Sequence, residues 1–587
     1  MKFKLKSKFI PLITAVTLPT ISLTSCFSSS DKKIYVTEQI PNELTLLANV
    51  NFNNLSREYL IKNQNINIFE NKTNKNIYIN VNEIFKKLNG FFDLKKLSKI
   101  DVVDAKAIIQ KNNGDVVEFS TTDDKLVFTD SQAFDLSKSS LTHNYNQYLH
   151  FLDTTFKSLR SKDELLPTLN LKKYDMPIYT QDKNIYMPLS LFNLLFMSQN
   201  YYNLQYNGTS LLGYDYENSH SFAHPKYVKF YRDANWTSTS EQRLNNYNFL
   251  ALLFDNFYGL SNELYKRHNS SDFNEFTHIT GLYDKIIDQN YSTYSNAYEQ
   301  LWYVYLNELH SRIITEGYLA PTNDNVNKSD SRQLSSKYAD YEKTLTKLQD
   351  LRALEKQKNS AVIEGNIARI KLDAFLSGSK EEINSKQPYL YDSYELMKAA
   401  IAKIKRLDPQ NKVKSIVIDI SQNGGGSSAA LEKVVGFLTK KPFNVFIQDR
   451  ITKAYVDLKI GVDTNSDNKY NNKDGYDEYN WYLLTGINTF SAANLFAHVV
   501  KQTGIAKIIG QKSGGGMFAV LPTVLPDGTN VDISGPIAYS AASDNVNTVE
   551  DLPISEFGVE PDYLYPYDDF YDLEKLSKFI NGIENIN

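Results

Sequence analysis

The chain has a single cysteine, Cys26, in 587 residues, so no disulfide can form within it. It also has no excess of charge of one sign, because 64 basic residues stand against 68 acidic ones and no long basic stripe follows the first residues. A nucleic-acid-binding protein is expected to show such a stripe, and we therefore exclude that class. With 42% hydrophobic and 22% charged residues, the composition is that of a globular protein of two or three domains.

The N-terminus combines a basic start, an apolar run and the cysteine. MKFKLKSK precedes FIPLITAVTLPTISL, which at about 15 residues is shorter than the roughly 20 residues of a membrane span. Leu23 to Cys26 (LTSC) resembles a lipobox, where a bacterial signal peptidase cuts before a lipid-modified cysteine. We expect a signal peptide over 1–25, a lipid anchor at Cys26, a polar tether over 26–36 and a place on the outer face of the cell membrane. An ordinary secretory signal with a coincidental cysteine is the alternative.

The rest of the chain divides by its hydrophobic pattern. Short β-like runs and two helical patches predict an α+β domain over 37–215, with binding or spacing as its role. Helical spacing predicts helices over 225–325, and the polar stretch 326–360 is typical of an exposed, charged helical insertion. From 361 to 587, strands alternate with helices, which predicts an α/β fold with a mostly parallel sheet.

Ser491 stands between a predicted strand that ends at Leu484 and a predicted helix that ends at Gly504. A helix N-terminus offers unpaired N–H groups and the positive end of the helix dipole, which stabilise developing negative charge. This place suits an acyl-transfer nucleophile, with the N–H of Ala492 as one oxyanion donor. Serine is also a favoured N-cap residue, so the stretch alone leaves both roles open.

Three consecutive glycines, Gly424 to Gly426, follow the buried strand SIVIDI and precede another helix. Such a loop exposes backbone N–H groups that bind a phosphate or an oxyanion. The stretch has neither the Gly-Lys-Ser/Thr of a Walker loop nor the spacing of a dinucleotide fingerprint, and we expect no cofactor. An oxyanion loop and a plain tight turn remain the alternatives.

Five motifs occur in order: the strand that ends in Asn-Gly-Gly-Gly, the serine at a helix start, IIGQKSGGG, LPDG at 525–528 and GVEPD at 558–562. In this order and spacing the chain resembles the tail-specific (carboxyl-terminal processing) serine proteases and the related tricorn core over roughly residues 360–575. The resemblance implies a crotonase-like ββα core that hydrolyses peptide bonds of protein or peptide substrates.

The resemblance also implies roles for single residues. Ser491 would be the nucleophile, and the oxyanion donors would be Gly424 or Gly425 together with Ala492.

The family divides by its general base. One branch uses a lysine in Gly-Lys-Gly, but aligning GQKSGGGM on that pattern places Gly516 where the lysine belongs, and Lys512 lies four residues earlier. The other branch uses a histidine in Leu-x-Asp-x-His-Ser/Thr at a helix end, which LNELHS at 306–311 matches with Glu308 in place of Asp. The resemblance therefore implies His310 as the base.

The other histidines lack this setting. His498 lies seven residues into the helix of Ser491, about 10 Å along its axis and beyond hydrogen-bond reach. The remaining six are expected to be surface or structural residues: His143, His150, His220, His224, His268 and His278.

The third member of a triad is a carboxylate that orients the imidazole and stabilises its cation. We assign it to Glu556, two residues before GVEPD. In the family the glutamate is expected one residue earlier, where this chain has Ser555, so Glu550 is the rival.

The stretch DTNSDNKYNNKD at 463–474 has acidic and amide residues at positions 1, 3, 5 and 12 of a calcium loop. Position 6 is Asn468 rather than glycine, and position 12 is Asp474 rather than glutamate. We expect a polar hairpin tip and no metal, with a calcium site as the alternative.

Together these features predict a lipid-anchored, cell-surface serine endopeptidase. About 50 residues separate LNELHS from the first core strand, too few for the PDZ domain that tail-specific relatives usually carry, so selection of C-terminal tails is not implied. The alternative from another class is a protease fold without turnover, a surface lipoprotein that binds peptides or host proteins.

Overall fold

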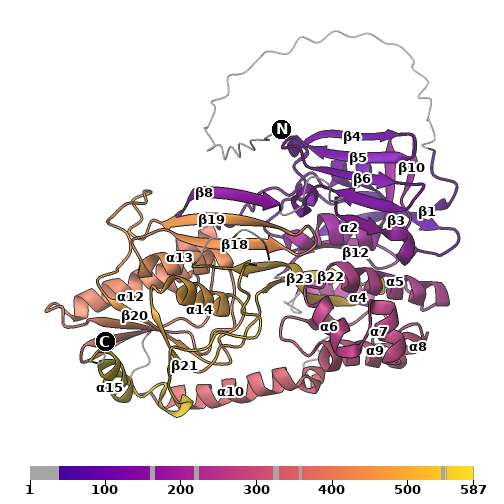
Figure 1. Cartoon of the computed structure of the whole chain (residues 1–587). Coiled ribbons are helices and arrows are strands. Elements are labelled where there is room, and N and C mark those ends of the chain that lie inside the picture. Colours follow the sequence, from indigo (N-terminus) through magenta and orange to yellow (C-terminus); the bar gives the residue numbers. More distant parts are fainter. Residues whose placement is uncertain are drawn as a thin grey trace, which may run out of the picture.

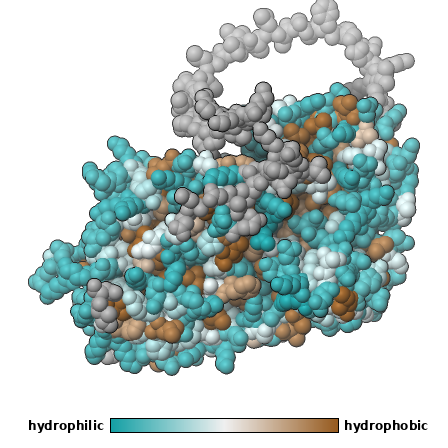
Figure 2. Space-filling model, in the orientation of Figure 1, coloured by the Kyte–Doolittle hydropathy of each residue, from teal (hydrophilic) through white to brown (hydrophobic). Residues whose placement is uncertain are grey.

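The computed structural model describes residues 39–158, 166–216, 224–321, 330–355, 360–543, 546, 549 and 551–585. The predicted signal peptide, Cys26 and the tether lie outside the described residues, as do His220 and Glu550. Within the described ranges, no helix is both long and apolar enough to cross a bilayer. Figure 2 shows hydrophilic side chains over most of the viewed face, with apolar ones scattered among them.

Two sheets build the N-terminal part (Figure 1). The first has seven strands in the order β10-β11-β3-β2-β1-β13-β12: β1 Leu44–Asn54, β2 Gln64–Asn71, β3 Ile77–Asn80, β10 Tyr179–Gln181, β11 Asn184–Pro188, β12 Tyr202–Tyr206 and β13 Leu211–Asp215. The second is antiparallel, in the order β4-β5-β6-β7-β9: β4 Leu97–Val103, β5 Lys106–Lys111, β6 Val116–Ser120, β7 Lys125–Phe128 and β9 Thr168–Asn170. The two predicted helical patches form α1 (Val81–Lys87) and α2 (Leu189–Phe196).

One strand of this region belongs elsewhere. β8 (Leu149–Ser158) pairs antiparallel with β19 (Ala454–Val462) and completes a sheet ordered β14-β23-β18-β19-β8 (Figure 1). Its other strands are β14 Arg312–Thr315, β18 Phe443–Asp449 and β23 Asn530–Ser540, and β22 (Phe518–Val524) pairs with β23. The α+β domain predicted over 37–215 is therefore not self-contained, because β8 is an edge strand of the C-terminal core.

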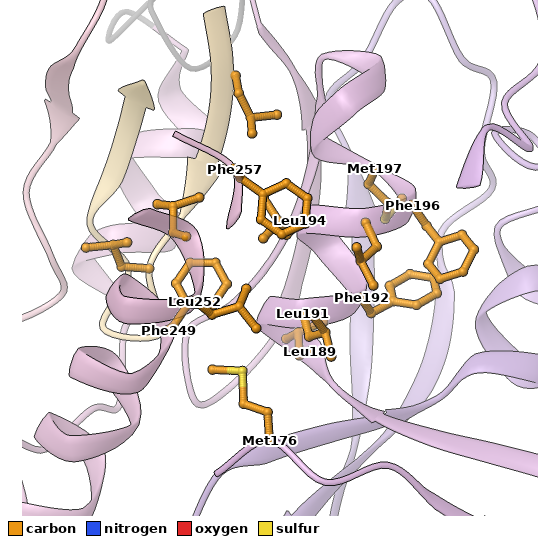
Figure 3. Close-up of a cluster of buried hydrophobic side chains, with 14 of the residues drawn as sticks. Met176, Leu189, Leu191, Phe192, Leu194, Phe196, Met197, Phe249, Leu252 and Phe257 are labelled. Atoms are coloured by element: carbon orange, nitrogen blue, oxygen red, sulfur yellow. The ribbon is translucent and has the colours of Figure 1, made fainter. Parts of the chain in front are cut away.

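The predicted helical region forms α4 Pro225–Arg232, α5 Ser240–Asn256, α6 Ser261–His268, α7 Phe273–Ile279, α8 Tyr283–Ile286 and α9 Tyr291–Glu299, then a π-helical segment, Gln300–Leu306. α2 is buried all round, as expected of a helix that is apolar on every face. Figure 3 shows Leu191, Phe192 and Leu194 of α2 in one cluster with Phe249 and Leu252 of α5. One hydrophobic core therefore joins the N-terminal part, the helical region and the β22–β23 hairpin.

The C-terminal core is a six-stranded sheet ordered β15-β16-β17-β20-β21-β24, parallel from β16 onward. Its strands are β15 Ala361–Glu364, β16 Ile367–Lys371, β17 Ser415–Asp419, β20 Asn480–Thr485, β21 Lys507–Gly510 and β24 Tyr563–Leu564. The helices α12 (Ser393–Leu407), α13 (Ser428–Leu438) and α14 (Ala492–Thr503) connect or follow them. The α/β fold predicted from the alternation of strands and helices is confirmed.

The two faces of this sheet follow the period of two residues along a strand. Ile416 and Ile418 pack in one core with α12, α13 and α14, and Val417 packs on the opposite face with α15 (Leu573–Glu584).

The segment predicted as an exposed insertion packs against the core. α10 (Ser336–Ala353) runs along the lower edge of the molecule in Figure 1. Its Leu348 is fully buried, and Arg352 donates to Asp419 at 3.2 Å at the end of β17. Most of its residues are polar, and for that reason the sequence indicated a solvated helix.

Candidate active site

Ser491 lies in the turn between β20 and α14. Its backbone has φ 56° and ψ −125°, which a residue with a side chain rarely adopts, and its side chain makes no capping hydrogen bond. The N-cap role therefore does not account for this serine. The Ser491 N–H donates to Gly515 O at 2.9 Å, and the Phe490 N–H donates to Asn423 O at 3.1 Å. Strain of about 1–3 kcal/mol persists at such a position only where the surroundings hold it, and these bonds do so.

Gly425 is in close contact with this turn. A Cβ on Gly425 would lie 2.7 Å from Ser491 Cβ and 3.1 Å from Ala492 N, so only glycine permits the approach. The Gly425 N–H donates to Asn423 Oδ1 at 2.9 Å. Of the two loop donors predicted for an oxyanion, Gly425 is thus already engaged.

Gly424 and Ala492 are the predicted donors that remain. Gly424 is exposed and lines the same cavity as Ser491, and its N–H has no acceptor among the described residues. Ala492 also lines the cavity, and as the first residue of α14 its N–H has no partner within the helix.

His310 follows the end of the π-helical segment, after Asn307 in the left-handed conformation. Both oxygens of the Glu308 carboxylate hold this turn, because one accepts the His310 N–H at 2.8 Å and the other accepts the Ser311 hydroxyl. Glu308, which stands where the motif has an aspartate, therefore positions the turn that carries His310.

The imidazole of His310 lies beside the turn that carries Ser491. Its ring centroid is 4.6 Å from that of Phe490, the residue before Ser491, and a Cβ on Gly516 would lie 3.1 Å from His310 Cε1. His310 and Ser491 line one cavity of about 1080 Å³. Two residues that are 181 positions apart in sequence are thus brought together.

Burial lowers the pKa of His310 below its usual 6.5, against the opposing charge of Glu308. The imidazole is therefore neutral at pH 7, the form in which it accepts a proton. Neither Nδ1 nor Nε2 has a hydrogen-bond partner among the described residues. The bond between His310 and Ser491 is not formed in this structure, as is common in active sites without substrate.

Glu556 is held by the segment that contacts His310. Its carboxylate accepts the Met517 N–H at 2.7 Å, and its carbonyl accepts the Gly516 N–H at 3.0 Å. Burial raises the pKa of Glu556 to about 7, with the Met517 N–H opposing this shift and the charge of Glu308 adding to it. Glu556 is close to the imidazole through Gly516 but makes no hydrogen bond with it.

α10 supplies a wall of the cavity that sequence reasoning missed. Tyr338, Tyr341 and Glu342 line it, and a Cβ on Gly424 would lie 2.9 Å from the Tyr341 hydroxyl. Asn488 Nδ2 donates to the Tyr341 carbonyl at 2.8 Å, which ties α10 to the turn before Ser491.

The residues set aside as bases lie elsewhere. Lys512 is half exposed and forms an ion pair with Glu560 at 2.9 Å. His498 Nε2 donates to Ala541 O at 3.0 Å, and burial lowers the pKa of His498 to about 4. His143, expected to be a surface or structural residue, lines the same cavity as Ser491.

The acidic loop at 463–474 folds around its own amides. Asp463 accepts the N–H groups of Ser466 and Asn468, each at 2.7 Å, and Asp474 accepts those of Thr464 at 2.9 Å and Asn471 at 2.8 Å. Both carboxylates are fully buried. This arrangement is that of a polar turn.

Comparisons with known proteins find similarity over part of the chain. Residues 366–565 match the family model of peptidase family S41. A photosystem II D1 C-terminal processing protease is 22% identical, with a TM-score of 0.26, and the match covers 37% of this chain and 47% of that one. The chain thus spans about half the length of that protease.

Two further solved structures are similar over more of their length. A putative peptidase from Parabacteroides merdae is 16% identical, with a TM-score of 0.36, over 56% of this chain and 90% of that chain. Mature CPAF complexed with lactacystin is 12% identical, with a TM-score of 0.38, over 59% and 99%. No curated protein matches this chain.

The matched segment contains the glycine loop and Ser491 and lies within the range predicted from the five motifs. The core is that of a serine-type peptidase. Over residues 366–565 the chain matches peptidase family S41.

The close approach of Gly425 to the serine turn can be tested by Gly425→Ala. The added methyl carbon would lie only 2.7 Å from Ser491 Cβ, so the serine would have to move. We therefore expect the labelling of Ser491 by a fluorophosphonate probe to fall by at least about tenfold. Gly504→Ala is the matched control, because Gly504 also has a positive φ, of 68°, but no atom lies within 4 Å of its added Cβ. Equal labelling of the two variants would contradict the role of the contact.

Proposed function

We propose that this chain is a serine endopeptidase with Ser491 as nucleophile and His310 as general base. The observation that carries the proposal is the serine's strained turn, which has no capping role and shares a cavity with a neutral imidazole packed on Phe490. A strained nucleophile and a buried base are the two parts that acyl transfer requires.

The reaction follows from these positions. His310 accepts the hydroxyl proton as Ser491 Oγ attacks the substrate carbonyl carbon. The oxygen of the tetrahedral intermediate accepts hydrogen bonds from Ala492 and Gly424. The imidazolium then protonates the departing amine, and water hydrolyses the acyl-enzyme by the same path in reverse.

Glu556 is the proposed third member. Its ionised form would stabilise the imidazolium, and its bond with Met517 holds it on the segment in contact with the ring. Glu308 is occupied with the backbone of the His310 turn and acts as a positioning residue.

We also propose that the protein is lipid-anchored through Cys26 on the outer face of the cell membrane. The support is the sequence LTSC after a basic and apolar segment, followed by a polar tether.

The choice of base predicts a pattern among three variants. Ser491→Ala and His310→Ala should each lose about 10³-fold or more of peptide hydrolysis, because the triad acts as a unit. Lys512→Ala should retain most activity, since its ammonium is paired with Glu560. Casein cleavage and fluorophosphonate labelling measure both effects. If Lys512→Ala loses activity while His310→Ala retains it, the general base is Lys512 and the chain uses a serine–lysine dyad.

The pH profile separates the two titrating groups. The reactive form has neutral His310 and ionised Glu556, so the fluorophosphonate labelling rate should rise with pH through about 7, the pKa of Glu556. In Glu556→Gln only His310 still titrates, so the labelling rate should rise with pH below 6.5, because the pKa of His310 is lowered. An unchanged limb near 7 in Glu556→Gln would exclude Glu556 from the site.

The anchor is tested by Cys26→Ser. The variant has no thiol to carry the lipid, and we expect it to leave the membrane fraction and enter the soluble medium. Immunoblotting of fractions measures this, with Ser25→Ala as the neighbouring control. Retention of Cys26→Ser in the membrane would mean that the apolar segment itself anchors the chain.

A further inference from the structure

Two arginines line the cavity that holds His310 and Ser491. Arg312 begins β14, two residues after His310, and Arg332 lies in the short 3-10 segment Asp330–Leu334 that precedes α10. The proposed reaction uses neither of them.

Arg312 is held in place by an ion pair. Its Nε donates to Asp532 Oδ2 at 3.0 Å, and its Nη2 donates to the Tyr216 hydroxyl at 3.3 Å. Asp532 is fully buried, so this pair holds Arg312 on the cavity wall.

Arg332 is different, because no carboxylate pairs with it in the described part of the chain. Its guanidinium lies 3.8 Å from the centroid of the Tyr338 ring. Glu342 also lines the cavity, and its charge partly offsets the loss of hydration at Arg332, but no ion pair within 4 Å joins the two side chains in the described part of the chain. Burial and the charge of Arg312 lower the pKa of Arg332, so its environment disfavours an uncompensated cation.

A guanidinium that has no carboxylate partner is able to bind one from a ligand. It presents five N–H donors in a planar fork that matches a carboxylate, and stacking on a tyrosine ring holds the plane in place. Buried or half-buried charges are ordinarily paired, and the Arg332 donors face a cavity in which a carboxylate could pair with them.

The acidic side chains on the same cavity are already occupied. Glu58 accepts the Tyr145 hydroxyl at 3.2 Å, Asp215 accepts the Arg57 N–H at 3.3 Å, and Glu382 accepts the Ser379 N–H at 2.8 Å within its own helix cap. No ion pair joins any of the three to Arg332 within the described residues.

We propose that Arg332, with Arg312 beside it, forms a subsite for a carboxylate of the bound peptide. The inference rests on the proposed peptidase function and adds to it a preference for acidic substrates. The carboxylate belongs either to an Asp or Glu side chain near the scissile bond or to the C-terminus of the peptide. Because both arginines line the same cavity as His310 and Ser491, the subsite belongs to the same cavity as the proposed site of cleavage.

Matched peptides distinguish the two sources. One arm replaces Gln by Glu at each position around the cleavage site of an internally quenched peptide. The other arm compares a free C-terminal carboxylate with its amide, with the terminus at different distances from the cleavage site. We expect kcat/KM to favour the acidic member by about tenfold at one position, as is typical of a charge-assisted hydrogen bond. The ratio should shrink at high salt.

Substitutions assign this preference to Arg332. Arg332→Gln should bring the ratio of acidic to neutral peptide close to one, and Arg332→Lys should keep part of it by retaining the charge without the fork. Lys347→Ala is the control, because Lys347 is on α10 but pairs with the exposed Asp568 and does not line the cavity. Its ratio should match that of the wild type.

A wild-type ratio near one at every position and terminus would overturn the proposal, and so would a ratio that survives in Arg332→Gln. If the wild type cleaves none of the peptides, the peptidase assignment fails. The subsite is then tested by measuring how tightly the peptides bind. Fluorescence anisotropy of the same labelled peptides with Ser491→Ala, alone and combined with Arg332→Gln, must then show tighter binding of the acidic member that depends on Arg332.

Discussion

The candidate site depends on how closely three backbone segments approach one another at Ser491. The turn after β20 is in contact with Gly425 on one side and bonded to Gly515 on the other. A Cβ on Gly515 would lie 1.9 Å from Glu556 O, so this second glycine also admits the segment of the proposed triad carboxylate. β17, β20 and β21 are adjacent and parallel, so their carboxyl ends bring these loops to one edge of the sheet. The glycines then allow the approach that the strained serine requires.

The imidazole reaches this edge from a different part of the chain, and the fold fixes that approach as well. β14 begins two residues after His310 and pairs with β23, so the histidine turn is hydrogen-bonded to a core sheet. Farther away, Arg243 of α5 donates to Asp527 in the LPDG turn at 2.8 Å, and both side chains are buried. Breaking such a pair leaves an uncompensated charge, so the helical region is held in one position against the β22–β23 hairpin.

The sequence predicts those parts of the site that depend on local signals. Alternating strands and helices and the helix start at Ser491 can be recognised within about 20 residues. The pairing of β8 with β19 cannot be recognised in this way, because the two strands are about 300 positions apart and neither sequence contains a signal that identifies the other strand. The engagement of the Gly425 amide depends on the orientation of Asn423, which a run of glycines does not show.

α10 is an intermediate case, in which a signal existed but was obscured by composition. Tyr338, Tyr341, Leu348 and Arg352 fall on one face of a helix with 3.6 residues per turn, and this face contacts the cavity and the core. The charged residues around them gave the segment the composition of a solvated helix.

The position of α10 has a mechanical consequence for selectivity. Its Tyr341 carbonyl is bonded to Asn488, three residues before Ser491, and its Arg352 is bonded to Asp419, at the strand end that leads into the glycine loop. This cavity wall is therefore attached to the same two turns that carry Ser491 and the proposed oxyanion donors. A displacement of α10 would therefore strain both of these bonds and the close contact of Gly425 with Ser491. Under the proposed function, this links the binding of a peptide along α10 to the geometry at Ser491.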